Sequence, residues 1–140
     1  MTDWDSRFLD LAGHVAGWSK DPSTKVGAVV VNDKRQVLGM GYNGFPRGVS
    51  DFASRYENRA TKLMFVAHAE RNALDNTFAD SEGATLYSTL FPCTDCAKGI
   101  IQRGIKRVVT TEPSETQWQR FNCEFSKIMF EEAGVELVVV

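Results

Sequence analysis

The stretch that decides the fold contains HAE at residues 68–70 and PCTDC at residues 92–96. His68 offers an imidazole nitrogen, and Cys93 and Cys96 offer two sulfurs spaced about one helical turn apart. These are donor types that zinc prefers, and three protein donors leave the fourth tetrahedral position to water. Glu70 can move the protons of that water without binding the metal. The pattern therefore predicts an open zinc site with His68, Cys93 and Cys96 as ligands and Glu70 as the catalytic proton shuttle.

The same motifs predict where two helices begin. Residues i and i+2 of a regular helix point to nearly opposite sides, so His68 and Glu70 can share a site only if a helix begins there. We expect one helix over 68–78 and another over 93–103, with Gly104 as the C-cap of the second. The partial positive charge at a helix N-terminus favours thiolates at Cys93 and Cys96.

A closed structural zinc site with four protein ligands is the alternative interpretation. It needs another soft donor, and His14 and Cys123 are the other candidates in the chain. His14 falls in an expected helix, whereas Cys123 lies off the apolar stripe of another, and neither belongs to a ligand-like pair. We interpret both as ordinary side chains, so the open site is favoured.

The rest of the chain predicts alternating helices and strands. Apolar residues at helical spacing indicate a helix over 4–18, and β-branched runs at 26–31 and 37–42 indicate a β-hairpin. Further strands are expected at 85–89, 106–111 and 135–140. After Pro113, one amphipathic helix is expected through Trp118, Phe121, Phe125, Ile128 and Met129. Residues 41–48 are too rich in glycine for regular structure, and 51–62 is expected to be a short exposed helix or a lid.

This order of elements predicts an α/β protein with a single domain over 1–140. Alternation of strands and helices favours parallel crossovers, whereas the hairpin adds an antiparallel pair. The expected fold is therefore a five-stranded mixed sheet covered by helices on both faces, a three-layer α/β/α arrangement.

Composition limits the function classes. The formal net charge is −2 and the pI is about 5.7, which argues against a broad nucleic-acid-binding surface but not against a small basic pocket. No apolar run approaches the roughly 20 residues of a membrane span, and the N-terminus lacks a signal-peptide pattern. Three cysteines, two of them in a C-x-x-C pair, fit reduced thiols. We expect a cytoplasmic protein that binds neither membrane nor nucleic acid.

The chain resembles the deoxycytidylate (dCMP) deaminase family, within the cytidine-deaminase-like superfold. H-x-E followed by P-C-x-x-C is the known signature of zinc-dependent nucleobase deaminases. The resemblance covers nearly the whole chain through KDPSTKVGAV at 20–29, GYNGFPRG at 41–48, HAERNA at 68–73, GATLY at 83–87, FPCTDCAK at 91–98 and GIKRVV at 104–109. It implies hydrolysis of dCMP to dUMP and ammonia, which supplies thymidylate synthesis.

The resemblance also implies roles for residues outside the zinc site. Asn43 is expected to hydrogen-bond the sugar, and Val26 and Ala67 are expected against the two faces of the pyrimidine. For the phosphate, we expect contributions from three cations that precede the zinc-binding histidine, because an arginine fork suits phosphate. These cations are Arg47, Arg59 and Lys62.

Regulation and assembly follow from the same resemblance. Many family members are hexamers activated by dCTP and inhibited by dTTP, with a Gly-Tyr-Asn-Gly segment in the effector site. This chain keeps the segment as Gly41, Tyr42, Asn43 and Gly44. The resemblance therefore implies an effector site there, Mg²⁺ accompanying dCTP, and a homo-oligomer, either a hexamer or a dimer. Some members carry a second, structural zinc site, but its ligands are absent from residues 19–67, so we expect one Zn²⁺ per chain.

Two other functions remain open at this stage. One is a deaminase for free cytosine, cytidine or adenosine in tRNA, which would share the zinc motifs. The other is a non-catalytic nucleotide sensor or structural subunit on the same fold. Glu70 argues against the second, because binding alone needs no proton shuttle.

Overall fold

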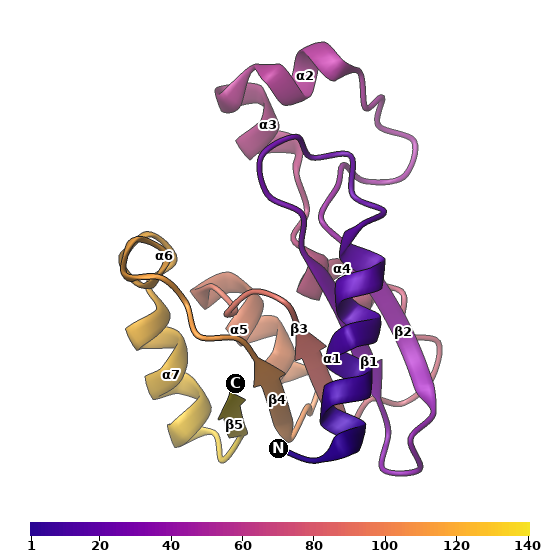
Figure 1. The fold of residues 1–140 in the computed structure, drawn as a ribbon, viewed down its shortest axis with the longest axis vertical. Coiled ribbons are helices and arrows are strands. Elements are labelled where there is room, and N and C mark those ends of the chain that lie inside the picture. The colour runs from indigo at the N-terminus through magenta and orange to yellow at the C-terminus, as the bar shows by residue number, and fades with distance from the viewer.

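The computed structural model describes residues 1–140 and has the expected alternation of helices and strands (Figure 1). In chain order the elements are α1 (Asp3–Ala16), β1 (Gly27–Val31), β2 (Val37–Tyr42), α2 (Ala53–Glu57), α3 (Arg59–Phe65), α4 (Ala69–Asp75), β3 (Thr85–Ser88), α5 (Thr94–Gln102), β4 (Arg107–Thr110), α6 (Glu115–Arg120), α7 (Cys123–Glu132) and β5 (Glu136–Val139).

The five strands form one mixed sheet in the order β2-β1-β3-β4-β5. β1 is antiparallel to both β2 and β3, whereas β3, β4 and β5 run parallel to one another. The parallel strands are joined by helical crossovers, since α5 connects β3 to β4 and α6 with α7 connects β4 to β5. The prediction of a five-stranded mixed sheet is confirmed.

Each face of the sheet is buried under helices, because successive strand residues point to opposite faces. Val29, Val31, Tyr87 and Val109 face α1, where they form a small core with Phe8 and Ala12. The larger core lies on the other face and includes strand residues such as Val30, Leu86 and Val108 with apolar residues of α4, α5 and α7. Figure 1 shows α1 in front of the sheet. The three-layer α/β/α arrangement is therefore confirmed.

Helix α1 is fixed to the sheet by a buried carboxylate. Thr2 and Asp5 form a capping box that begins the helix. The Asp5 carboxylate, 1% exposed, accepts hydrogen bonds from the Tyr87 hydroxyl at 2.8 Å and from Arg107 at 2.6 and 2.8 Å. The Arg107 guanidinium holds the pKa of Asp5 well below its usual range, against the effect of burial. One side chain of α1 thus binds both β3 and β4.

Two helices replace the single helix expected through Trp118 and Met129, so that prediction was wrong. Asn122 adopts a left-handed conformation with φ of 53°, and this separates α6 from α7. The break rotates the buried face of α7 away from the expected stripe. Phe125 is 59% exposed and Ile128 40% exposed, while Cys123, Ser126 and Phe130 are buried.

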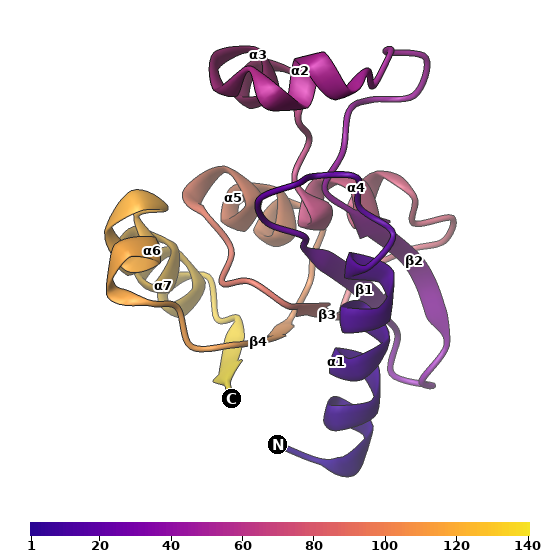
Figure 2. The same ribbon diagram turned by 45° about the horizontal axis from the view of Figure 1, so that its top comes forward.

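The strand expected at 37–42 is confirmed as β2, so the irregular segment expected at 41–48 begins only after Tyr42. Within β2, a β-carbon on Gly41 would lie 2.3 Å from the Ala73 nitrogen, and only glycine allows this close approach to α4. Two other segments differ from expectation. Helix α4 ends at Asp75, short of residue 78. Segment 51–62 lies in two short helices, α2 and α3, which stand apart from the sheet in Figure 2.

No helix of the structure is both long enough and apolar enough to span a lipid bilayer.

Replacing Asp5 with asparagine is expected to lower the free energy of unfolding by about 3 kcal/mol at pH 7, because it leaves the Arg107 guanidinium without its buried partner. The pKa of Asp5 is depressed in the folded state, so its stabilisation is present above the unfolded-state pKa near 3.9 and is lost as pH falls through the folded value. Urea unfolding of both proteins between pH 3 and 7 measures this. A difference that stays constant below about pH 4 would contradict the assignment.

Candidate active site

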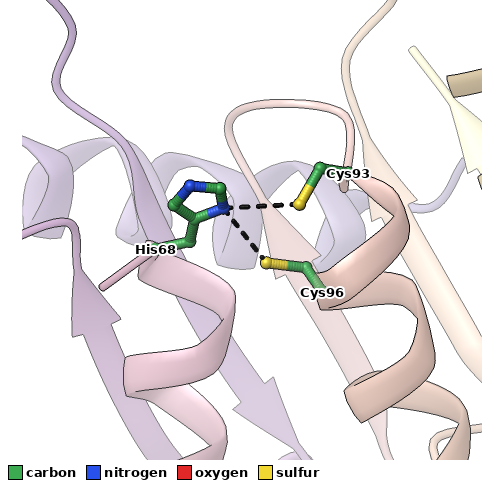
Figure 3. Close-up of side chains that lie close together, drawn as sticks. All are labelled: His68, Cys93 and Cys96. Carbon is green, nitrogen blue, oxygen red and sulfur yellow. Dashed lines mark hydrogen bonds between the residues drawn. The ribbon is translucent and has the colours of Figure 1, made fainter. Parts of the chain in front are cut away.

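Two helix starts bring the three expected zinc ligands together. His68 is the N-cap of α4 and Cys93 is the N-cap of α5, both with extended backbone angles. Neither side chain caps its own helix. Both are turned instead toward the gap between the two helices, where Cys96 from the first turn of α5 joins them (Figure 3). Helix α4 begins at Ala69, between His68 and Glu70, and both residues line one cavity.

The donor atoms are spaced as zinc requires. The His68 Nδ1 atom lies 3.4 Å from the Cys93 sulfur and 3.4 Å from the Cys96 sulfur. In a tetrahedral site, a nitrogen at 2.1 Å and a sulfur at 2.3 Å from zinc are about 3.6 Å apart. No other group of three or more histidine, cysteine or acidic side chains converges in the molecule. His68, Cys93 and Cys96 therefore fit one zinc ion and provide three ligands.

The contact between the two thiols shifts their pKa values in opposite directions. A hydrogen bond from Cys96, with help from His68, lowers the pKa of Cys93 to about 4 despite burial. The same contact raises the pKa of Cys96, because its proton is shared with the neighbouring thiolate. Cysteine binds zinc as the thiolate, so metal binding displaces this remaining proton. Metal affinity should accordingly fall as pH is lowered.

Glu70 lies in the first turn of α4 and is only 4% exposed. Burial raises the pKa of its carboxyl above the usual value, with opposition from His68. A carboxyl whose pKa is shifted toward neutrality can both accept and donate a proton at neutral pH. Its side chain lines the same cavity as His68 and Cys93.

The cavity above these residues has a volume of about 180 Å³. Its walls come from the loop before β1, the end of β2, helix α3, the loop before α5, and helix α6. The lining residues are Asp21, Ser23, Thr24, Val26, Asn43, Arg59, Lys62, Leu63, Val66, His68, Ala69, Glu70, Leu90, Phe91, Cys93, Gln117, Arg120 and Phe121.

The structure brings some of the sequence-predicted substrate residues to this cavity and leaves others outside it. Val26, Asn43, Arg59 and Lys62 line it. Arg47 does not; it is exposed and donates a hydrogen bond to Asn76 at 2.6 Å.

Ala67 is also absent from the cavity wall, and its backbone pairs with Gly44 in an isolated bridge. Its neighbours Val66 and Ala69 line the cavity instead.

Lys62 is not a free cation. Its ammonium is buried and lies 3.2 Å from the Asp21 carboxylate, with only 10% and 5% of the two side chains exposed. Asn43 is similarly engaged. Its Oδ1 accepts from the Val26 N–H at 2.8 Å, and its Nδ2 donates to the Thr24 carbonyl at 2.9 Å.

Sequence reasoning missed the contribution of α6. Gln117, Arg120 and Phe121 line the cavity, although they follow Cys96 by more than twenty residues. Trp118 packs edge-on against Phe91 with ring centroids 5.8 Å apart, and this contact holds α6 near the zinc ligands. No local motif marks these residues, because they reach the cavity only through the tertiary packing of α6.

Comparison with known proteins agrees with this geometry. The family described as "Cytidine and deoxycytidylate deaminase zinc-binding region" matches residues 2–112. A deoxycytidylate deaminase of Mus musculus is 41% identical over 95% of this chain and 77% of its own length. An "Uncharacterized deaminase in luxG 3'region" of Aliivibrio fischeri is 42% identical over 98% of this chain and 93% of its own. A dCMP deaminase from the cyanophage S-TIM5, solved in complex with dCMP and dUMP, superposes with a TM-score of 0.79 at 27% identity, covering 100% and 99% of the two chains.

Replacing Glu70 with alanine is expected to slow deamination by at least about 100-fold, because the expected proton shuttle is lost. Zinc should remain at one equivalent per chain, since Glu70 is not a ligand. Ammonia release and metal analysis by mass spectrometry measure the two effects. Asp75→Asn, on the exposed side of the same helix, is the matched control and should leave both unchanged.

In the same analysis, Cys96→Ser should lose stoichiometric zinc, whereas Cys123→Ser should retain it. Two equivalents of zinc in the unmodified protein would overturn the single-site assignment.

Proposed function

Because the chain belongs to the family of cytidine and deoxycytidylate deaminases, we propose that it hydrolyses dCMP to dUMP and ammonia. The observation that carries this proposal is one cavity that is lined by His68, Cys93 and Glu70 and, from other helices, by the exposed residues Arg59 and Arg120, whose side of the cavity we call its mouth. Such an arrangement separates a reactive end, which would hold the base, from a cationic end, which would hold a phosphate. The dUMP so formed would be available for thymidylate synthesis.

The reactive end requires a nucleophile and a proton carrier. When bound, zinc supplies the nucleophile at neutral pH, because it lowers the pKa of a water that it binds to about 7. Glu70 would accept the proton of that water and deliver it to N3 of the cytosine ring, and it would then accept the proton of the hydroxyl group added at C4 and deliver it to the departing amine. Its burial keeps bulk water from competing for these protons. The backbone N–H groups at the start of α5 would stabilise charge that develops on the ring.

The middle of the cavity is suited to a pyrimidine nucleoside. Val26, Val66, Leu90 and Phe91 provide apolar walls for a flat ring. Asn43 Oδ1 accepts one hydrogen bond, from the Val26 N–H, so it retains a lone pair that could accept from a sugar hydroxyl. We therefore propose that Val26 and the neighbours of Ala67 contact the faces of the pyrimidine ring, and that Asn43 contacts the sugar.

The phosphate would be held at the mouth by Arg59 of α3 and Arg120 of α6. Both side chains are exposed and line the cavity from different helices. Neither forms an ion pair within the chain, whereas the charge of Lys62 is matched by Asp21. Arginine presents a planar fork of donors that suits a phosphate better than a lysine point charge does.

We also propose that dCTP with Mg²⁺ activates the protein and that dTTP inhibits it. We propose as well that the protein assembles into a homo-oligomer. Tyr42 is 40% exposed and meets Trp18 edge-on, so an aromatic surface is available at the Gly41–Gly44 segment for an effector base. Leu63 and Met64 on α3 are 50% and 81% exposed, which gives apolar surface for a second copy. Light scattering with and without dCTP would measure the assembly.

We also place the protein in the cytoplasm, where the thiols of Cys93 and Cys96 stay reduced.

The experiment that tests the function is loss of the cytosine absorbance with dCMP, deoxycytidine, CMP and cytosine, each with and without dCTP and Mg²⁺. We expect dCMP to be the best substrate and dCTP to lower its KM. Activity on the nucleoside or base but not on dCMP would remove the phosphate site and keep the zinc chemistry. Inactivity on all four with zinc bound would instead favour a tRNA adenosine deaminase or a nucleotide sensor.

Arg59→Ala and Arg120→Ala are each expected to raise the KM for dCMP by about tenfold, the loss of one charge-assisted contact. The kcat/KM for deoxycytidine should stay unchanged because it has no phosphate. Arg47→Ala is the matched control, since Arg47 lies outside the cavity. Equal decreases in kcat/KM for dCMP and deoxycytidine would contradict the assignment of Arg59 and Arg120 to the phosphate. A decrease seen only in Arg47→Ala would contradict it as well.

A further inference from the structure

One wall of the cavity is carried by a part of the chain that stands apart from the sheet. Helix α3 and its C-cap bring Arg59, Lys62, Leu63 and Val66 to the cavity. Figures 1 and 2 both show α2 and α3 away from the layers that contain the zinc ligands, joined to them by extended connections. The position of this wall therefore depends on the backbone bridge between Ala67 and Gly44, on the contact of Phe65 with Phe45, and on a few other side-chain contacts, and not on packing against the central core.

The buried ion pair of this region joins Lys62 of α3 to Asp21, at 3.2 Å. A second ion pair to the same region, Lys20 with Asp51, has side chains 67% and 46% exposed. Exposed pairs contribute little to stability, whereas removing one partner of a buried pair leaves an uncompensated charge. Phe45 and Tyr56 add a stacked aromatic contact with centroids 4.3 Å apart. Among the ionic contacts, the Lys62–Asp21 pair is the one able to fix α3.

Asp21 binds more than Lys62. Its Oδ1 also accepts from the backbone N–H groups of Ser23 and Thr24 at 2.8 and 3.2 Å, and its Oδ2 accepts from Asn43 Nδ2 at 3.4 Å. Although burial opposes ionisation, these hydrogen bonds and Lys62 keep the pKa of Asp21 below its usual value. One carboxylate, 4% exposed, thus joins the loop before β1, the end of β2 and helix α3.

All three of these segments line the substrate cavity, and none of them carries a zinc ligand or Glu70. Asp21 is therefore placed to govern how substrate is held without taking part in the proton transfers. Nothing in the reaction chemistry uses its charge, yet the carboxylate is buried and almost fully hydrogen-bonded.

We propose that Asp21 is a positioning residue for substrate binding, which acts through Lys62 and Asn43 to set the distance between the α3 wall and the zinc site. Lys62 then serves as the link between α3 and Asp21, and the phosphate contacts fall to Arg59 and Arg120. The proposal rests on the proposed function for the identity of the substrate, but the link itself can be measured without any substrate.

The kinetic test compares Asp21→Asn, Lys62→Met and the double variant. Each single change should raise the KM for dCMP by about tenfold, with kcat within about twofold and zinc retained, because the chemistry at Glu70 is untouched. The double variant should be no worse than the more severe single variant, since both break the same link. Effects that multiply in the double variant would overturn the proposal.

Amide hydrogen exchange gives a readout that needs no activity. Asp21→Asn and Lys62→Met should each speed exchange in residues 59–66 of the α3 wall by about tenfold or more. A purely local role for Asp21 in the turn at residues 21–24 would instead speed exchange only near that turn. Asp51→Asn, which removes the exposed ion pair to the same region, is the matched control and should leave exchange in 59–66 and the KM unchanged.

These two measurements separate the possible failures. If the unmodified protein does not turn over dCMP, the proposed function fails while exchange still tests the link. If Asp21→Asn does not fold, Lys62→Met decides alone, because it leaves the turn at Asp21 intact. Unchanged exchange in residues 59–66 of Lys62→Met would overturn the proposal.

Discussion

The site depends on the convergence of two helix N-termini. His68 and Cys93 occupy N-cap positions, where backbone angles are extended and a side chain would ordinarily turn back to cap its own helix. Here both side chains point across the gap between α4 and α5, and Cys96 completes a set of donors 3.4 Å from the imidazole nitrogen. Two helix starts also direct backbone N–H groups and partial positive charge at the same point. If either helix began one residue later, His68 and Glu70, or the two sulfurs, would no longer face one site.

The rest of the structure divides into a closely packed part and a part that stands apart from the sheet. The sheet, with α1 on one face and α4, α5 and α7 on the other, fixes the reactive end of the cavity. The Asp5 carboxylate strengthens this part by joining α1 to β3 and β4. The mouth is formed by α3 and α6, which are short and held by few contacts. Helices α1, α4, α5 and α7 are held in place by packing on the sheet, whereas we propose that α3 is held by the buried ion pair of Lys62 with Asp21.

Much of this could be predicted from the chain alone, because the relevant signals are local. The spacing of His68, Glu70, Cys93 and Cys96 specified the donors, and the need for His68 and Glu70 to share a site specified the helix start. Alternating β-branched runs specified five strands, and their order with helices favoured a mixed sheet. The mistaken helix through Trp118 and Met129 shows the limit, since an apolar stripe cannot reveal that Asn122 adopts φ of 53° and rotates the face that follows.

By itself, then, the sequence determined the fold class and the three side chains of the zinc site, since each is specified by residue types at short spacing, and the same spacing led to the proposal of Glu70 as the acid–base residue. Only the tertiary structure decided which cations face the cavity. Arg47, Arg59 and Lys62 are equivalent by composition, but Arg47 turns to Asn76, Lys62 is paired with Asp21, and Arg59 stays at the mouth. Arg120 joins it from a distant segment. The position of the charged group of a long side chain depends on ion pairing and on packing between distant segments. Neither can be predicted from the spacing of neighbouring residues.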